Sequence, residues 1–155
     1  MLKIVRLDER LIHGQVVTSW VTNESITEIM VVDKSVCNDE MRKSLMSMAV
    51  PEYISILFVD VDEAVRTYEE ECEYEDLMII FGNPYDILEF INKGGKLNRV
   101  NVGGMSCKGQ RRQVCTSVFA DEKEMEIFRE IAGKNVVLEA KMLPTDKSVD
   151  LTKII

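Results

Sequence analysis

Histidine, closely spaced cysteines and long apolar runs are scarce in this sequence. There is one histidine, His13, and the four cysteines include no CxxC pair, which excludes the usual Cys/His ligand spacings of a zinc site. The longest apolar run, Leu77–Phe81, is far shorter than the ~20 residues that span a bilayer. The start of the chain lacks the apolar segment of a secretory signal. We therefore expect a cytoplasmic protein with reduced thiols, no metal, no cofactor and no insertion into a membrane.

Positive charge is also in short supply. The chain has 27 acidic and 19 basic residues, which gives a formal net charge of -8. This balance excludes a general electrostatic attraction to nucleic acid or to anionic lipid. Any phosphate site must therefore be a local arrangement of basic groups. A chain of 155 residues that is 46% hydrophobic can bury one substantial core, so we expect a single domain over residues 1–155.

Short apolar segments alternate with segments of helical period. The predicted strands are Leu2–Leu7, Thr27–Val32, Ile54–Val59, Leu77–Gly82, Arg99–Val102, Val114–Ala120 and Val136–Lys141. The predicted helices are Gly14–Thr22, Asp39–Met48, Asp62–Glu71, Pro84–Asn92 and Glu122–Ala132. Most strands lack polar alternation, which is typical of a sheet covered on both faces. The pattern predicts an α/β fold: a doubly wound, mostly parallel open sheet of about seven strands with helices on both faces.

The region from Gly103 to Arg112 is the one long stretch with no predicted helix or strand. It is rich in glycine and polar residues and links two predicted strands. Either a hairpin-like excursion or a functional loop fits this composition.

The densest group of chemically active residues lies in Arg6–Gln15, where the first predicted strand gives way to the first predicted helix. In open α/β sheets, ligands collect outside the carboxyl ends of the strands. His13 would lie at the amino end of the helix, where the helix dipole favours a neutral imidazole with a lone pair able to attack phosphorus. The position makes His13 a candidate for accepting a phosphoryl group.

Neighbouring residues could receive the anionic product. Arg10, three residues before His13, carries a guanidinium that matches phosphate oxygens, and the N–H groups of a first helical turn also bind anions. Asp8 and Glu9 would orient a guanidinium or a ring N–H. The further candidates for phosphate binding are Arg6, Gly14 and Gln15. A polar cap on the helix beside a surface ion pair between Asp8 and Arg10 would fit the same residues, so position alone leaves both interpretations open.

Three other phosphate chemistries fit less well. A C-x5-R phosphate loop fails because Gln113 follows Cys107 at the required spacing, and the corresponding positions after Cys37 and Cys115 are also not arginine. A nucleotide site would need further glycines around Gly14 or a GxxxxGK[ST] motif. A receiver domain needs paired acids after the first strand to hold magnesium, whereas here the pair Asp8-Glu9 is followed at once by Arg10 and then His13.

The most basic cluster of the chain consists of Lys108, Arg111 and Arg112. Solvated charge on a loop explains such a cluster without a function. Because the loop follows a predicted central strand, these three residues could also dock an acidic partner protein, which we keep as a hypothesis.

Several ordered motifs resemble the IIB proteins of the mannose/fructose/sorbose class of the bacterial phosphoenolpyruvate-dependent phosphotransferase system. They are RLDERLIHGQVVTSWV, VVDKSVCNDEMRKSLMSMAVP, FGNPYDILEFINKGG, NVGGMS and LPTDKSVDL. The resemblance covers nearly the whole chain and is far more specific than one short pattern. The chain departs from the family's pattern at Lys34, where a second acid is frequent, and at Cys37, where alanine is frequent.

The resemblance implies a role for each residue of the first motif. His13 would be phosphorylated by a IIA protein at the ring nitrogen nearer the main chain, Arg10 would stabilise the transferred group, and Asp8 would support Arg10. The phosphoryl group would then pass to a sugar bound by a IIC/IID membrane permease, with which the chain associates peripherally. The alternative from another class is a regulatory protein that keeps the histidine but signals sugar status by binding another protein.

Overall fold

The computed structural model describes residues 1–14 and 17–155. Its strands are β1 (Leu2–Asp8), β2 (Glu28–Val32), β3 (Ser55–Val59), β4 (Leu77–Phe81), β5 (Arg99–Gly104), β6 (Arg112–Cys115), β7 (Val118–Ala120), β8 (Val137–Ala140) and β9 (Val149–Asp150). Its helices are α1 (Gly14–Glu24), α2 (Lys34–Cys37), α3 (Glu40–Met48), α4 (Val61–Tyr74), α5 (Pro84–Asn92), α6 (Glu122–Gly133) and the 3-10 helix η1 (Leu151–Lys153).

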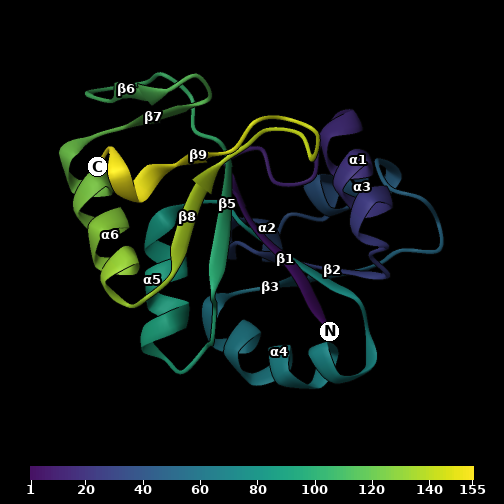
Figure 1. The fold of residues 1–155 in the computed structure, drawn as a ribbon. Coiled ribbons are helices and arrows are strands. Elements are labelled where there is room, and N and C mark those ends of the chain that lie inside the picture. The colour runs from purple at the N-terminus through teal and green to yellow at the C-terminus, as the bar shows by residue number, and fades with distance from the viewer.

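A seven-stranded sheet with the order β3-β2-β4-β1-β5-β8-β9 forms the centre of the described part of the chain (Figure 1). Its strand pairs are parallel except for the last, where β9 runs antiparallel to β8. The predicted α/β class and the mostly parallel sheet are therefore confirmed. Because β1 lies between β4 and β5, its carboxyl end is at the middle of the sheet, where ligands of such folds collect.

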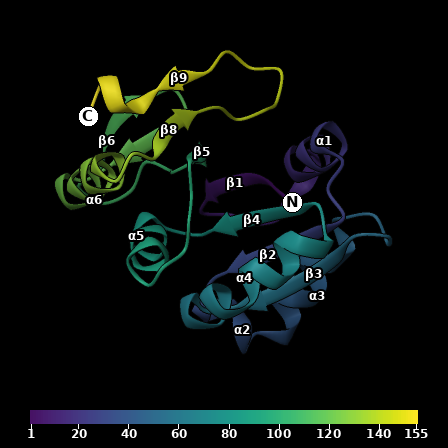
Figure 2. The same cartoon turned by 60° about the horizontal axis from the view of Figure 1, so that its bottom comes forward.

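Helices cover both faces of the sheet, as predicted. In both views α5 and α6 lie together and away from α1 and α3 (Figures 1 and 2). One buried cluster joins the sheet to α4, α5 and α6, and a second joins the other face to α1, α2 and α3. Strands β2 and β4 are buried along their whole length, which explains the continuous apolar runs of the sequence.

Side-chain caps fix the predicted helix starts. Asn83 accepts a hydrogen bond from the Asp86 N–H at the start of α5, where Pro84 occupies the first turn. Asp121 and Glu124 form a reciprocal capping box at the start of α6. These caps explain why the starts of α5 and α6 could be predicted to the residue.

Two parts of the prediction differ from the structure. The predicted strand Val114–Ala120 is wrong as one strand: β6 and β7 form a separate antiparallel hairpin around Thr116 and Ser117. Two polar residues inside an apolar segment favour a turn. The stretch Gly103–Arg112, for which an excursion or a functional loop was expected, leads from the end of β5 to the start of β6 and does not itself form the hairpin. The short elements α2 and β9 were not predicted, since four and two residues are too few to show a period.

None of the helices within residues 1–14 and 17–155 combines the length and apolar character that crossing a membrane requires.

Aromatic packing under α5 predicts where the fold is most sensitive. Phe90 is fully buried and makes edge contacts with Tyr68 and Phe81, at ring-centroid distances of 5.3 and 5.6 Å. We expect Phe90→Ala to lower the free energy of unfolding by about 3–5 kcal/mol, because it leaves a cavity in the core. Urea unfolding monitored by circular dichroism measures the change. Tyr53→Ala, at an exposed aromatic residue, is the control, and an equally small effect of both substitutions would contradict the assignment of the core.

Candidate active site

A tight turn connects β1 to α1 and carries the candidate histidine. The Leu11 N–H donates to the carbonyl oxygen of Asp8 (2.9 Å), and Leu11 adopts a φ of 58°, in the left-handed region. This conformation costs a residue with a side chain roughly 1–2 kcal/mol. The side chains of Leu11 and Ile12 are buried in the core beside α1, which offsets the strain and fixes the turn. His13 follows as the N-cap residue of α1, where the sequence predicted it.

The buried carboxylate of Asp8 is the centre of the site. Its Oδ2 lies 3.0 Å from His13 Nε2 and accepts a hydrogen bond from the Arg6 guanidinium at 3.2 Å. Its Oδ1 accepts from the Arg10 backbone N–H at 3.1 Å and lies 3.7 Å from Arg10 Nε. Asp8 thus contacts Arg10, as expected, and orients His13 directly as well.

These contacts determine which nitrogen of His13 can react. Asp8 is an acceptor toward Arg6 and Arg10, so the proton of the His13 hydrogen bond belongs on Nε2. A neutral imidazole protonated on Nε2 has its lone pair on Nδ1, the ring nitrogen nearer the main chain. The side chain of His13 is 19% exposed, which leaves it accessible at the surface. The geometry therefore favours Nδ1 as the nucleophile.

Arg10 and Gly14 lie beside this histidine on the solvent side. The Arg10 side chain is 57% exposed, and Asp8 is its one ion-pair partner within residues 1–14 and 17–155. Its terminal nitrogens can therefore turn toward an arriving phosphate. Gly14 has a φ of 43°, in the left-handed region that favours glycine, and a Cβ built there would meet nothing within 4 Å, so the space beside Gly14 is open. Gln15, the other predicted phosphate-binding residue on this side, lies outside the described residues.

The prediction that Arg6 binds phosphate is wrong. Its guanidinium is fully buried, donates to Asp8, Asn101 and the Lys141 carbonyl oxygen, and lies 5.4 Å from the centre of the Trp20 ring. A side chain enclosed in this way cannot reach a phosphoryl group on the surface. Arg6 instead forms an ion pair with Asp8, and its positive charge compensates the negative charge of a carboxylate buried inside the protein.

Two residues that the sequence analysis did not single out make room for this arginine. A Cβ on Gly103 would meet Arg6 Cζ at 2.1 Å, so only glycine leaves space for the guanidinium. Asn101 stands opposite Arg6 in the pairing of β1 with β5 and accepts its hydrogen bond. The asparagine in an otherwise apolar strand and the following glycine pair were the signals available in the sequence.

The predicted docking cluster separates into residues with different surroundings. Arg111 is only 10% exposed and binds the carboxylates of Glu9 (2.8 Å) and Glu124 (2.7 and 2.8 Å). Lys108 also reaches Glu9, at 2.9 Å, but stays 63% exposed. Burial alone would raise the pKa of Glu9, but the Ser106 N–H, Lys108 and Arg111 outweigh it and lower the pKa to about 2.

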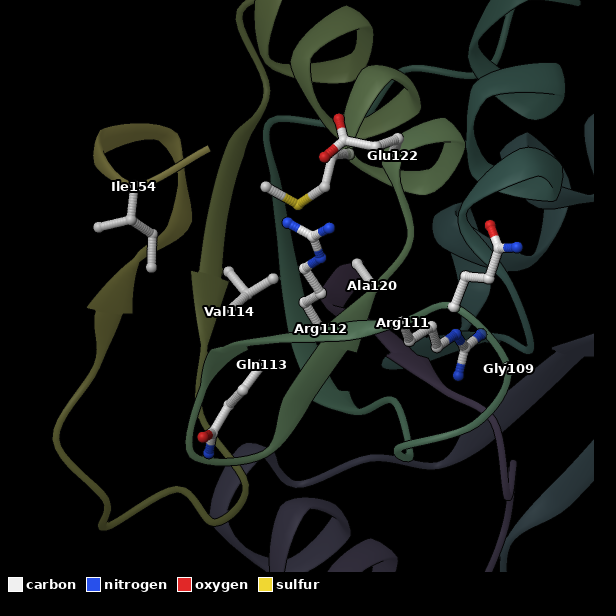
Figure 3. A pocket seen from close by; sticks show the side chains of 10 residues that line it. Gly109, Arg111, Arg112, Gln113, Val114, Ala120, Glu122 and Ile154 are labelled. Atoms are coloured by element: carbon white, nitrogen blue, oxygen red, sulfur yellow. The ribbon is translucent and has the colours of Figure 1, made fainter.

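Arg112 has an exposed position of its own. It lines a cavity of about 630 Å³ between the β6–β7 hairpin, α6 and the end of the chain. Figure 3 shows its side chain extending toward Glu122, away from Arg111. Among the ion pairs of the described residues, none involves Arg112. A partner protein can therefore reach Lys108 and Arg112, whereas the Arg111 guanidinium is committed to contacts within the chain.

Comparison with known proteins gives consistent relatives along the whole chain. Residues 2–155 match the family described as the PTS system sorbose subfamily IIB component. The fructose-specific EIIB component of Bacillus subtilis is 36% identical over all of this chain and 97% of its own length. The mannose-specific EIIAB component of Escherichia coli is 33% identical over all of this chain, which spans about half (48%) of that longer relative.

Solved structures agree with the sequence comparison. The IIBSor domain of the sorbose permease from Klebsiella pneumoniae superposes with a TM-score of 0.92 at 30% identity, covering 99% of this chain and 94% of that domain. The N-acetylgalactosamine-specific IIB component 1 from Escherichia coli gives 0.91 at 25% identity, covering 96% and 97%. Fold and sequence agree over the whole chain, which therefore belongs to the sorbose subfamily of PTS IIB components.

Proposed function

We propose that residues 1–155 act as one phosphocarrier domain, a sugar phosphotransferase component that relays a phosphoryl group through His13. The donor is a phosphohistidine on a IIA protein, and the acceptor is a sugar taken up through a IIC/IID permease. The observation that carries the proposal is the 3.0 Å contact between His13 Nε2 and the buried Asp8 carboxylate. The joined name EIIAB of the mannose-specific relatives supports a IIA partner. Family membership supports a site of action in the cytoplasm, at the inner surface of the membrane.

The geometry accounts for reversible transfer without a proton acceptor. The Nδ1 lone pair of His13 forms the new N–P bond as the N–P bond of the donor breaks. The proton on Nε2 stays in place, and the positive charge that the ring gains faces the Asp8 carboxylate. Because Asp8 also pairs with Arg6 at 3.2 Å, its carboxylate is held in place under the ring, and the site can stabilise this charge each time the group arrives.

Arg10 supplies the second element of transfer, charge stabilisation on the phosphoryl oxygens. Its contact with Asp8 at 3.7 Å keeps the guanidinium beside His13 while leaving it largely exposed. Phosphoryl transfer depends chiefly on alignment and electrostatics, so one anchored nucleophile and one adjacent guanidinium are the main requirements.

The choice of sugar is proposed to reside in the permease. Relatives named for mannose, fructose, sorbose and N-acetylgalactosamine share 28–36% identity with this chain. Phosphate is the one ligand that a relay domain must recognise in every such system, and the residues around His13 are suited to it.

Replacement of the nucleophile tests the proposal. We expect His13→Ala to take up no acid-labile phosphate from phosphorylated IIA, whereas wild type and Cys107→Ser, at an exposed thiol, are labelled. Phosphorus NMR of the labelled wild type should show the group on Nδ1. With permease membranes, the labelled protein should yield sugar phosphate. Labelling of the His13→Ala variant would contradict the assignment of His13 as the nucleophile. If the wild type is labelled but yields no sugar phosphate with permease membranes, the result would favour a regulatory protein.

Removal of the adjacent guanidinium should slow the chemical step. We expect Arg10→Ala to reduce the transfer rate about 10²–10³-fold, the usual effect of losing one electrostatic donor. Its stability should hardly change, because the side chain is mostly exposed. Rapid-quench kinetics and thermal unfolding measure the two quantities. Arg66→Ala, at an exposed arginine on α4, is the matched control, and a normal rate for Arg10→Ala would remove Arg10 from the mechanism.

Lys108 and Arg112 are proposed to dock an acidic face of IIA. Both are exposed, and Arg112 faces a groove beside α6. We expect Lys108→Gln and Arg112→Glu to raise the KM for phosphorylated IIA at low salt while kcat is retained, because surface charges act mainly on encounter. The difference from wild type should shrink as salt is added. A KM equal to that of wild type and of Arg66→Glu at low salt would rule out docking through these residues.

A further inference from the structure

Glu9 in the active-site turn is held from outside the turn on both of its carboxylate oxygens. Oε1 accepts hydrogen bonds from the Ser106 backbone N–H and from the Ser106 hydroxyl, the latter at 3.0 Å. Oε2 accepts from the Arg111 guanidinium at 2.8 Å. The Glu9 N–H also donates to the Gly104 carbonyl oxygen at 3.2 Å. The backbone of Glu9 is therefore fixed to the end of β5, and its side chain to the segment that follows β5.

Arg111 connects this segment to a helix that is remote from the turn in the sequence. Its Nε and one terminal nitrogen form a two-point contact with Glu124 on α6, at 2.8 and 2.7 Å. Its other terminal nitrogen binds Glu9 and the Ser106 carbonyl oxygen. A two-point contact between a guanidinium and a carboxylate specifies orientation as well as attraction.

Glu124 is a rigid attachment point. Its side chain is almost fully buried, and its Oε1 also accepts from the Asp121 N–H in the capping box of α6. The carboxylate is thus held by its own helix as well as by Arg111. Helix α6 packs in the core with β7 and β8, so the chain of contacts runs from the core to the turn.

We propose that Arg111, through Glu9 and Glu124, is a positioning residue for phosphoryl transfer. Glu9 lies between Asp8 and Arg10, so holding its side chain fixes the turn that presents both of them and His13. A misplacement of about 1 Å at a reacting group can cost a factor of 10² in rate, so small movements of this turn matter. This inference rests on the proposed phosphocarrier function and gives Arg111 a role distinct from docking.

The low pKa of Glu9 fits such a role. Because this pKa is about 2, the Glu9 carboxylate stays charged throughout the neutral pH range, and its contact with Arg111 stays formed. The contact between Glu9 and Arg111 therefore holds the turn constantly and does not respond to pH in that range.

The test compares Arg111→Met, which keeps the aliphatic stem, with Arg129→Met at an exposed position of the same helix as Glu124. We expect Arg111→Met to lower kcat for transfer from phosphorylated IIA about 10- to 100-fold. The KM for IIA should stay unchanged, because docking is not affected. The control should match wild type. Nitrogen NMR of His13 should show a mixture of ring tautomers in the variant, in place of the single form protonated on Nε2.

Glu9→Gln provides a second route to the same contact and keeps the test decisive if Arg111→Met does not fold. It should lower kcat in the same way, and the double variant should lose little more than either single variant, because both remove one interaction. A folded Arg111→Met with wild-type kcat and a single His13 tautomer would overturn the proposal. A raised KM with normal kcat would also overturn it, in favour of docking. If the wild type itself takes up no phosphate, the proposed function fails. The nitrogen NMR spectra of His13 in the wild type and in Arg111→Met would then still decide whether Arg111 positions the turn.

Discussion

The buried carboxylate of Asp8 is the group on which the rest of the site depends. Its Oδ2 atom contacts both the guanidinium of Arg6, which is buried inside the protein, and the imidazole of His13, which is partly exposed. A carboxylate without solvent is tolerable only where cations and donors surround it. Strand β1 makes this arrangement possible, because residues two apart on a strand point to the same face, which places Arg6 directly behind Asp8. The glycine at position 103 then follows as a requirement, since the guanidinium occupies the space of its side chain.

The sequence contained most of the fold and the central part of the site. Continuous apolar runs predicted the parallel strands, and Asn83, Pro84 and Asp121 predicted the helix starts, because these signals are local. Position after β1 made His13 and Arg10 candidates, and the resemblance of the first motif to a known family supplied the roles expected of them. The β6–β7 hairpin was not predicted, because Val114–Ala120 has the composition of one strand and only its pairing partner shows where it turns.

The arginines of the candidate site that were assigned differently by the sequence have one feature in common: their partners inside the protein are not visible in the local sequence. Arg6 is close in sequence but points into the protein, where Asn101 and Trp20 surround it. Arg111 was grouped with Lys108 and Arg112 by composition, yet its partners are Glu9 and Glu124, which lie 102 and 13 residues away. Long-range ion pairs of this kind have no local signature, so the sequence could not separate the structural arginine from the exposed ones.

The distribution of charge explains how an acidic chain presents a phosphate site. At the end of β1, Arg6 and Arg10 face the single carboxylate of Asp8, which leaves a local excess of positive charge. One residue away, Glu9 would cancel that excess, but its charge is taken up by Lys108 and Arg111. Interactions between exposed charges fade beyond about 10 Å in salt, so the net charge of -8 elsewhere matters less to an arriving phosphoryl group than these few neighbours. Neutralising Glu9 from the β5–β6 segment therefore serves electrostatics as well as geometry: it keeps the positive charge of Arg10 available to the phosphate.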